Sequence, residues 1–582
     1  MSCVRRFTSI PRARVAILDG IDVSMSIDFL GLHFGNNHIK RLEKAREDPS
    51  LFPEIARDMF AKPESFAKAI LKSNPHLLSK PAPGKITVRR EWANYVHTQV
   101  AHPFEICKPA SLEELKAVLR DAAKKRHRVR AVGSGHAWSD AALTDGIVIE
   151  THALDKVIPL DPGTLHKPSQ ADELFQVEAG ITIKELNNTL DHEGKALINM
   201  GGYDGQTIAG VISTSTHGSG LELPSLSGLV EALIVVTAEG EVLQIEKQDG
   251  ISHPSAFALK YGAERKLCQD DRLFQAFVVG VGSLGVIYAV ILRVTTKYWL
   301  SEVRIIETWP EVKEKLKLGK ILKEHRHVEV LLNPHKVDGQ NHCLLTTREK
   351  RDKAPETTPS EEAQRLRRLF EHFIASLDSH GAALAWVFNE YPAIAQWLLQ
   401  EGLKVLEDKE PYVDISYRIF NVGAVNGYDG ICAEYGLDLD VHVDATDAIL
   451  AAAEDAQQDG IYHSSPIALR YVAASPGYLS MQPQPTCMIE IPLFRDVFGT
   501  NETLWRYENL LTRKFKARPH WGQLNFMTGS RDMVRQLYPK VDEWIAVFNE
   551  FNKDGRFYST FTDRVGFSSH APAVAAGAGG GR

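Results

Sequence analysis

The sequence predicts an α+β protein with more than one domain. Between residues 86 and 300, short β-branched runs alternate with amphipathic helical segments, a pattern typical of mixed sheets and helices. Apolar residues make up 44% and charged residues 24% of the 582-residue chain, as in ordinary globular proteins. The chain is too long for one simple domain, since domains average roughly 150 residues. These observations exclude a disordered, collagenous or coiled-coil protein.

Charge and cysteine content narrow the class of function. The 67 Lys and Arg residues against 74 Asp and Glu residues give a net charge of -7. A mildly acidic chain lacks the basic stripe with which nucleic-acid-binding proteins displace counterions, so we expect no nucleic-acid partner. The 6 cysteines are far apart and form no CxxC pair. This argues against a zinc ribbon or a disulfide scaffold and indicates a cytoplasmic or otherwise intracellular, reducing compartment.

Two segments resemble membrane or targeting signals but fall short of them. The apolar stretch 277–292 is shorter than the roughly 20 residues that span a bilayer, so we interpret it as two buried strands joined by a turn. The N-terminus carries arginines before its first acidic residue, Asp19, as organellar presequences do, but no long amphipathic helix follows. We expect no integral membrane segment, and organellar targeting stays open.

The expected elements follow in order along the chain. Residues 38–80 have apolar residues at three- and four-residue spacing, cut by prolines, and are expected to form a helical extension. Ser111 is expected to cap a helix over 111–126, with Glu114 completing a capping box. Strands are expected at 129–132, 147–150, 175–179, 233–238 and 242–246, and a second helix at 182–194.

Beyond residue 300 the pattern loosens into strands and longer helices. Residues 346–368 are charged and rich in Pro, Thr and Glu, which predicts a mobile surface loop leading into a helix. His442 and Asp444, like His325 and His327, alternate along expected strands as solvent-facing polar positions. Neither pair has a third and fourth ligand at useful spacing, so we predict no metal site.

Residues 280–285 match the GxGxxG pattern of dinucleotide-binding proteins, but their context is wrong. The motif binds a pyrophosphate when it follows a strand and opens a helix, whereas the residues that follow here are β-branched and strand-like. Ile305 stands where an acidic partner of the ribose is expected. A nicotinamide-binding Rossmann domain is therefore not predicted.

Two other glycine-rich loops are stronger candidates for a phosphate site. The first, 131–139, follows an expected strand, and the second spans 207–220. Both combine glycines with Ser and Thr, so backbone N–H groups and hydroxyls can converge on phosphate oxygens. Either loop alone is equally well explained as a tight turn. The two together suggest one extended, phosphate-bearing cofactor held at two points.

The segment VRAVGSGHAWSDAALTDGIVIETHALDKVI, residues 129–158, resembles the PCMH-type FAD-binding domain of the vanillyl-alcohol oxidase superfamily. Within it the match is to the sugar-1,4-lactone and alditol oxidases, such as gulonolactone, arabinonolactone and alditol oxidases. The resemblance continues through 177–194, the 207–220 loop and 279–287, and it resumes at 518–522. It implies a two-domain FAD protein with an antiparallel-sheet substrate cap.

The resemblance also implies how the chain is divided. We expect a helical extension at 1–85, an FAD-binding domain at 86–300, a substrate-binding cap at 301–510, a C-terminal segment at 511–568 that returns to the flavin, and a disordered tail at 569–582. The oligomeric state is not indicated.

On the cofactor side, His136 matches the histidine that is bonded to the flavin 8α-methyl in covalent members, which implies histidyl-FAD. A non-covalent histidine in a phosphate loop is the alternative. Gly201 matches a position through which oxygen reaches the flavin in related enzymes, so Gly201 and Gly202 either leave that path open or simply form a turn. The remaining residues assigned by resemblance are Ala131, Val132, Gly133, Ser134, Gly135 and Ala137 around the diphosphate, Thr207, Gly210, Thr214, Ser215, Thr216 and His217 along the flavin, and Ile287 on the adenine side.

The substrate side departs from the family. Sugar-lactone and alditol oxidases carry a Glu-x-Arg pair on a strand, and here Arg470 is present but Ala468 replaces the glutamate. The HWxK signature becomes His520-Trp-Gly-Gln523, which loses a cation near the flavin. Glu490 stands where relatives have a histidine facing the substrate. We hypothesise that Glu490, paired with Arg470, abstracts the proton or binds the substrate, and a structural ion pair is the alternative.

The implied reaction is hydride transfer from a CH–OH carbon of a sugar lactone, polyol or related alcohol to flavin N5, with oxygen reduced to hydrogen peroxide. Two alternatives remain at this point. The altered site could serve a less polar alcohol or an amine, or the protein could bind flavin without oxidising sugars.

Overall fold

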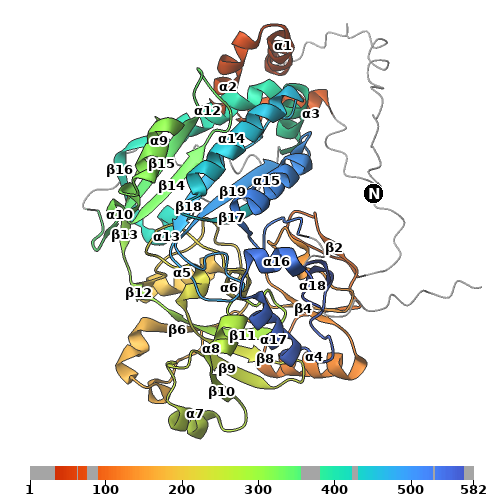
Figure 1. Ribbon diagram of the computed structural model, residues 1–582, viewed down its shortest axis with the longest axis vertical. Coiled ribbons are helices and arrows are strands. Elements are labelled where there is room, and N and C mark those ends of the chain that lie inside the picture. The colour runs from red at the N-terminus through yellow and green to blue at the C-terminus, as the bar shows by residue number, and fades with distance from the viewer. Residues whose placement is uncertain are drawn as a thin grey trace, which may run out of the picture.

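The computed structural model describes residues 33–61, 63–74, 90–355, 381–421, 430–527 and 531–568. These residues form two units, one above the other in Figure 1. The lower unit contains both glycine-rich loops, and the upper unit, the cap, is built on one large sheet. Helices and both parallel and antiparallel strands are present, which confirms the predicted α+β class.

The lower unit contains a parallel and a mixed sheet. The strands of the parallel sheet are, in order, β3 (Glu105–Cys107), β5 (Ile147–Glu150) and β4 (Val129–Val132). The mixed sheet has the order β10 (Lys266–Gln269), β9 (Val242–Glu246), β8 (Val230–Val236), β11 (Val286–Arg293) and β6 (Leu174–Glu178). Two small pairs are β1 (Trp92–Ala93) with β2 (Val100–Ala101), and β7 (Lys195–Ala196) with β12 (Thr295–Thr296).

Capping residues begin the helices of the lower unit. The Ser111 hydroxyl accepts a hydrogen bond from the Glu114 N–H at the start of α4, while the Glu114 carboxylate accepts from Ala110 N–H, so the predicted box closes one residue earlier. Thr182 and Glu185 form a complete box at α5. The helices of this unit are α4 (Leu112–Lys125), α5 (Ile183–His192), α6 (Ile208–Ser213), α7 (Pro254–Tyr261) and α8 (Asp271–Phe277).

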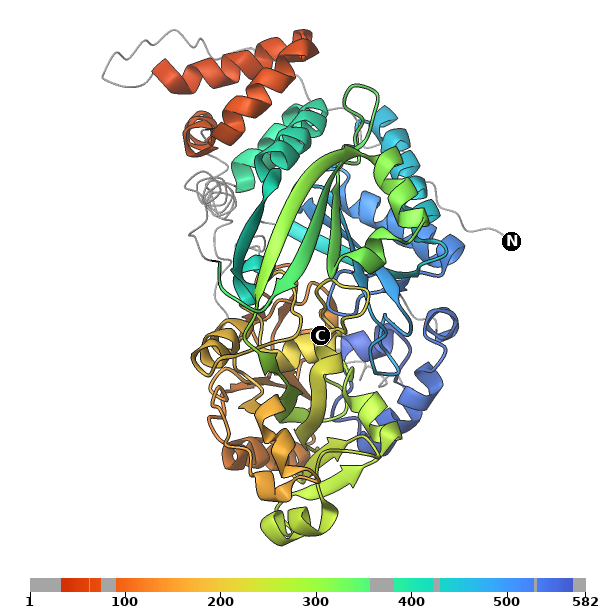
Figure 2. The same ribbon diagram turned by 90° about the vertical axis from the view of Figure 1, so that its left-hand side faces the viewer.

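An eight-stranded antiparallel sheet forms the cap unit. Its order is β16 (Asp408–Ile415), β13 (Trp299–Thr308), β15 (His342–Arg351), β14 (His327–Leu332), β18 (Ile467–Val472), β19 (Thr486–Phe494), β17 (Gly430–Asp438) and β20 (Arg518–Pro519). Helices α9 (Trp309–Lys317), α14 (His442–Gln458) and α15 (Thr500–Phe515) cover one face (Figure 2). Two short helices, α10 (Ile321–Glu324) and α13 (Ser416–Phe420), complete this part.

The central strands of this sheet have two chemically different faces, because successive side chains of a strand alternate in direction. Leu469, Ile489 and Tyr435 face the helices and are fully buried in an apolar cluster. Their neighbours Arg470 and Glu490 lie on the opposite face, toward the lower unit. The alternation therefore brings charged groups to the boundary between the units.

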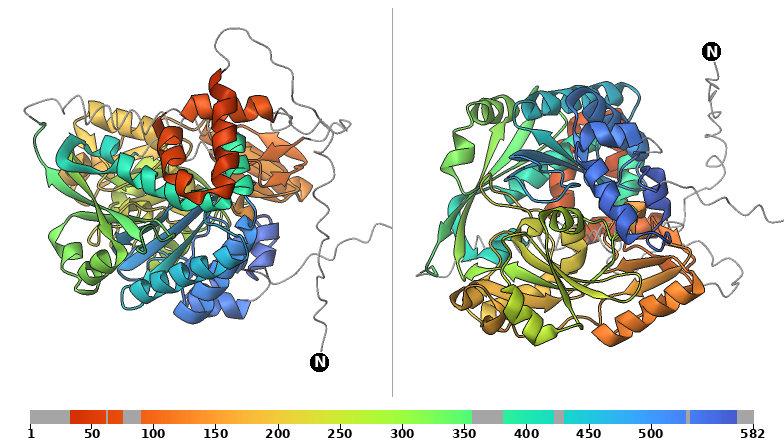
Figure 3. Two further views of the ribbon diagram at one scale, coloured as in Figure 1. Left: turned by 90° about the horizontal axis from the view of Figure 1, so that it is seen from above. Right: turned by 60° about the horizontal axis from the view of Figure 1, so that its bottom comes forward.

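The chain crosses between the units more than once. Its C-terminal part first adds β20 to the edge of the cap sheet, and then α16 (Arg531–Leu537), α17 (Val541–Phe551) and α18 (Thr560–Arg564) pack into the core of the lower unit. At the other end, α1 (His33–Glu47), α2 (Phe52–Ala61) and α3 (Pro63–Ser73) pack with α12 (Ala395–Leu406) of the cap in a separate apolar cluster (Figure 3). The extension is thus attached to the cap.

Three local predictions were wrong. The apolar stretch 277–292 is the end of α8, a turn and the single strand β11, not two strands. His442 begins helix α14 instead of lying in a strand. Residues 346–351 extend β15, while the rest of the expected loop, from 356, lies outside the described residues. In each case tertiary packing or a neighbouring strand decides the structure.

The expected tail at 569–582 also lies outside the described residues. Across the described ranges, no helix is both long and apolar enough to cross a membrane.

Candidate active site

One cavity lies between the two units, with an empty volume of about 1700 Å³ including its open mouth. Loops of the lower unit form one wall, and the charged face of the cap sheet with residues 520–523 forms the other. The predicted residues that line it are Ala131, Val132, Gly133, Ser134, Gly135, His136, Ala137, Gly202, Thr207, Gly210, Thr214, Thr216, His217, Ile287, Arg470, Glu490, His520 and Gln523. The structure therefore brings both glycine loops and the substrate-side candidates to one place.

The first glycine loop touches the second at Gly133. A Cβ atom at this position would lie 1.9 Å from Thr207 Oγ1, so no larger residue fits without moving a loop. Gly135 has a φ of 69°, a conformation that glycine adopts at little cost. In the part of the chain that is described, the N–H groups of residues 134–137 find no acceptor. They are therefore available to an anion in the cavity.

His136 lies at the end of this loop, between two aromatic rings. Its imidazole stacks on Tyr95 at a centroid distance of 4.5 Å and lies 4.5 Å from the ring of Tyr203. Burial lowers the pKa of His136 to about 4, so the ring is neutral at ordinary pH. A neutral ring nitrogen retains the lone pair that a bond to an electrophilic carbon requires.

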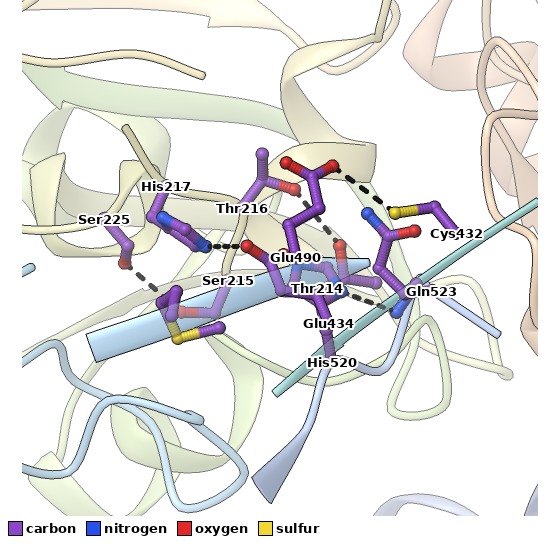
Figure 4. A network of polar contacts seen from close by, with 12 residues as sticks. Thr214, Ser215, Thr216, His217, Ser225, Cys432, Glu434, Glu490, His520 and Gln523 are labelled. Carbon is purple, nitrogen blue, oxygen red and sulfur yellow. Dashed lines mark hydrogen bonds and ion pairs between the residues drawn. The ribbon is translucent and has the colours of Figure 1, made fainter. Parts of the chain in front are cut away.

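The second loop starts α6 with Thr207 as its N-cap. Thr214 and Thr216 line the cavity, but Ser215 does not. Ser215 has a φ of 57° and a fully buried hydroxyl, which hydrogen-bonds to Gln482 at 2.8 Å and to Ser225 and Ser227 (Figure 4). Its side chain therefore fixes the loop from behind, and we assign it no contact with a cofactor.

Glu434 of β17 is a cavity residue that sequence reasoning missed. Its carboxylate accepts a hydrogen bond from His217 Nε2 at 3.0 Å, and its other oxygen is 4.0 Å from His520 Nε2 (Figure 4). His217 Nδ1 faces the Gly218 carbonyl at 2.8 Å. Both ring nitrogens of His217 therefore face oxygen atoms, which fix the orientation of the ring beside Glu434. Burial raises the pKa of Glu434, but the charge of His217 outweighs this and holds it below its ordinary value.

His520 and Gln523 complete this wall of the cavity. His520 Nδ1 accepts a hydrogen bond from Gly522 N–H at 3.0 Å, and burial lowers the pKa of His520 to about 4, so the ring is neutral with its proton on Nε2. The Gln523 side-chain oxygen is buried and has no partner among the described residues. An amide of this kind is suited to a ligand that supplies the missing hydrogen bond.

Charges of alternating sign cross the cap sheet from the cavity. Arg470 is paired with Glu490 and, through Nε at 3.1 Å, with Glu329, which also accepts from Arg348 at 3.1 Å. Arg348 continues to Glu302 at 2.7 Å. Burial acts to raise the pKa of Glu329, but the two guanidiniums lower it to about 2. Burial acts to lower the pKa of Arg470, but the carboxylates of Glu490 and Glu329 outweigh this effect and raise it.

The rejected GxGxxG segment also lines the cavity. Gly280 to Gly285 form a turn, and strand β11 follows it, as the context predicted. Ile287 is half-buried at the start of that strand. The segment therefore contributes backbone to the cavity without being a Rossmann turn.

The cavity fits FAD. Free N–H groups surround a tight glycine loop for a diphosphate, a neutral histidine lies at the end of that loop, and a buried amide without a partner faces the same space. FAD would be held by residues 131–137, by the 207–217 loop and by 280–287.

Comparisons with known proteins identify the cofactor and give matches to two family models. Residues 104–246 match the family described as FAD binding domain, and residues 290–565 match the family D-arabinono-1,4-lactone oxidase. The chain thus matches one family that binds FAD and one family of sugar-lactone oxidases. It is an FAD-dependent oxidoreductase that acts on CH–OH donors.

Two relatives that are matched over almost their whole length are gulonolactone enzymes. The chain is 27% identical over 476 residues to L-gulono-1,4-lactone dehydrogenase of Mycobacterium tuberculosis, covering 81% of this chain and 98% of the relative. It is 24% identical over 482 residues to L-gulonolactone oxidase of Bos taurus, covering 82% and 98%.

Solved structures agree in fold. A solvent-stable cholesterol oxidase superposes with a TM-score of 0.60 at 15% identity, covering 84% of this chain and 100% of that one. A VAO-type flavoprotein from Myceliophthora thermophila gives 0.53 at 12% identity, with 80% of each chain covered. At these identities the likeness concerns the fold alone.

In the described ranges, no cluster of three or more His, Cys, Asp or Glu residues could hold a metal ion. His325 hydrogen-bonds to Glu349, whereas His327 and His442 are buried and not solvent-facing as the sequence suggested.

Replacing Gly133 by Ala tests the contact between the two glycine loops. The new Cβ would overlap Thr207 Oγ1, so the loops must separate, and we expect the purified Gly133→Ala chain to carry less than about a tenth of the normal FAD. The ratio of flavin to protein absorbance measures this. Gly163→Ala is the control, because its Cβ would lie 3.2 Å from a flexible Asp161 carboxylate in an exposed turn. Normal FAD content in Gly133→Ala would contradict the assignment.

Proposed function

We propose that the protein oxidises a CH–OH group of a sugar 1,4-lactone or a closely related polyol, with oxygen as the electron acceptor. The observation that carries this is the Arg470–Glu490 pair on the cap face of the cavity. The relatives named above act on gulonolactone, and the matched D-arabinono-1,4-lactone oxidase family covers 290–565, which includes the whole cap sheet. A hydroxyl-rich, uncharged substrate suits a site whose charges are already paired.

Glu490 is assigned as the proton acceptor, and the register of the sheet supports this. Ala468 on β18 lies directly opposite Glu490 on β19. Directly opposed residues have Cβ atoms about 5 Å apart and point to the same face. The carboxylate that relatives carry at the position of Ala468 is therefore replaced by one on the neighbouring strand, within reach of the same volume. Glu490 accepts the hydroxyl proton of the substrate there.

We assign to Arg470 the role of orienting the substrate oxygen. Its two carboxylate partners keep the guanidinium charged and hold it against the sheet. As Glu490 removes the proton, negative charge develops on the substrate oxygen, and a fixed cation beside it stabilises that charge. Arg470 would thus act together with Glu490 and not as a structural anchor alone.

FAD, when bound, accepts the two electrons of the oxidation and passes them to the acceptor. The cap sheet lies over the loops and so limits the access of water to the reacting atoms. Gln523 offers a neutral hydrogen bond where the family has a charged lysine. His520 and Glu434 hold their own positions through the hydrogen bonds described above, so they present a fixed polar wall to the substrate.

Oxygen is proposed as the acceptor because Gly201 leaves space in the cavity wall. A Cβ there would lie 3.3 Å from the His217 carbonyl and 3.4 Å from the Thr216 methyl, so a side chain would fill this space. The product would be hydrogen peroxide. A reducing compartment inside the cell is proposed because the five cysteines that the structure describes, at 107, 268, 343, 432 and 487, are free.

Anaerobic mixing with sugar lactones tests the proposed activity. L-gulono-, L-galactono- and D-arabinono-1,4-lactone should bleach the flavin absorbance, and re-admitted air should restore it with one peroxide per turnover. Glu490→Gln should slow the bleaching by about a hundredfold, since the proton acceptor is lost. Glu410→Gln, on the exposed part of β16, is the control and should leave the rate unchanged. Absence of bleaching by every lactone and polyol, in a chain loaded with FAD, would exclude the proposal.

Denaturation in acid tests the covalent bond to His136. Because the ring is neutral and lies at the end of the diphosphate loop, we expect the flavin to stay on the denatured polypeptide and to fluoresce in a gel. His136→Ala should release all flavin under the same conditions, while His520→Ala should retain it. Fluorescence on the His136→Ala chain would assign the bond to another residue.

A further inference from the structure

Arg130 is a buried cation in the wall of the cavity that has no carboxylate partner. Four arginines are buried in the described part of the chain. Arg348 pairs with Glu302, Arg518 with Asp438 and Arg556 with Asp554, at 2.7, 2.8 and 3.9 Å. Arg130 is 1% exposed and alone among them has no carboxylate within 4.0 Å.

The partners of Arg130 are neutral oxygens from two loops. Its guanidinium donates to the carbonyls of Val281 and Gly282, each at 2.9 Å, and to the Ser283 hydroxyl at 2.9 Å. Its Nε donates to the Ala141 carbonyl. Four of the five N–H groups of the side chain therefore have an acceptor, but its charge is not neutralised.

These bonds also set the direction of the 280–285 turn. Val281 has a φ of 43°, which is unfavourable for a β-branched residue, and its carbonyl points inward to Arg130. Since the C=O and N–H of one trans peptide point in opposite directions, the Gly282 N–H points away from Arg130. Gly282 lines the cavity, together with Arg130 and the 133–137 loop. One side chain thus supports the backbone of the cofactor wall from behind.

The other charged groups around the cavity do not balance Arg130. Asp140, the carboxylate that acts on it most, is itself paired with Arg564 at 2.6 Å. Glu434 and Glu490 belong to the opposite wall and are paired with His217 and Arg470. Burial disfavours an isolated charge strongly, and a guanidinium does not lose its proton in exchange. Among the described residues, Arg130 is therefore a buried positive charge that no carboxylate pairs with, and a bound anion can offset it.

We propose that Arg130 is the buried counter-charge of the FAD diphosphate, and that it couples cofactor binding to the order of the 280–285 turn. The diphosphate brings two negative charges to the cavity that Arg130 lines. Backbone N–H groups supply the direct hydrogen bonds, and Arg130 supplies the net charge through the loop that it supports. This inference rests on the FAD cofactor and does not depend on which alcohol is oxidised.

Binding of ADP and adenosine to full-length, cofactor-free protein tests this, using chain produced under riboflavin limitation. ADP shares the diphosphate of FAD and adenosine does not. Arg130→Gln keeps hydrogen-bond donors but loses the charge, and Arg130→Lys keeps the charge with fewer donors. We expect Arg130→Gln to weaken ADP binding by about tenfold or more and Arg130→Lys to weaken it far less. The affinity for adenosine should change by the same factor in both variants. Arg348→Gln, in the cap sheet, is the control and should leave the ADP-to-adenosine affinity ratio unchanged.

Equal loss of ADP affinity in the Lys and Gln variants would overturn the proposal, because it would show that Arg130 acts through hydrogen bonds alone. An unchanged ADP-to-adenosine ratio in the Gln variant would overturn it as well. If cofactor-free chain cannot be obtained folded, the FAD content of chain purified under limiting riboflavin replaces the titration. There the Lys variant must carry more FAD than the Gln variant, and equal contents would refute the counter-charge.

Discussion

The candidate site depends on the alternation of side chains along three neighbouring strands of the cap sheet. Each strand places an apolar residue under helices α14 and α15 and the next residue over the cavity. Because one face must stay apolar to form a core, the register of the strands is fixed, and with it the position of every charge on the other face. A shift of one residue would bury Glu490 among leucines and remove it from the cavity.

The two walls of the cavity handle charge differently. On the cap side the charges are paired within the protein, from Glu490 through Arg470 and Glu329 to Arg348, which leaves this wall close to neutral. On the lower side Arg130 is unpaired and backbone N–H groups are free. This difference favours an anionic cofactor against the lower wall and a neutral substrate against the cap wall. The net charge of the whole chain does not reveal it, since the relevant charges are local.

Local signals in the sequence were sufficient for much of the lower unit. Strands β4 and β5, the caps of α4 and α5 and the rejection of the GxGxxG turn all depend on residues close together in the chain, and the structure has them. The fold class and the cofactor followed from the resemblance of these segments. The start of helix α14 was wrongly predicted as a strand, because His442 and Asp444 were interpreted as alternating polar positions of a strand.

Contacts between distant segments could not be predicted in the same way. Glu434 lies 217 residues from its partner His217 in the chain. The sequence of the strand around it does not indicate that its carboxylate is buried at the cavity. The sequence suggested that backbone N–H groups and hydroxyls hold the diphosphate. It gave no sign of the buried charge of Arg130, because this residue looks like an ordinary strand residue in VRAV. The sequence suggested Glu490 as a substitute for the glutamate missing at Ala468, but the cross-strand register that puts the two residues directly opposite each other is known only from the structure.

The central claim is that the face and position of the carboxylate matter, and not the strand that carries it. The rate of anaerobic flavin reduction by a sugar lactone in the exchange variant Glu490→Ala/Ala468→Glu measures this directly, with Glu490→Ala as the reference. The account predicts that the exchange recovers most of the rate lost in Glu490→Ala, because the carboxylate returns to the same face one strand away. An exchange variant as slow as Glu490→Ala, with normal FAD content, would contradict it.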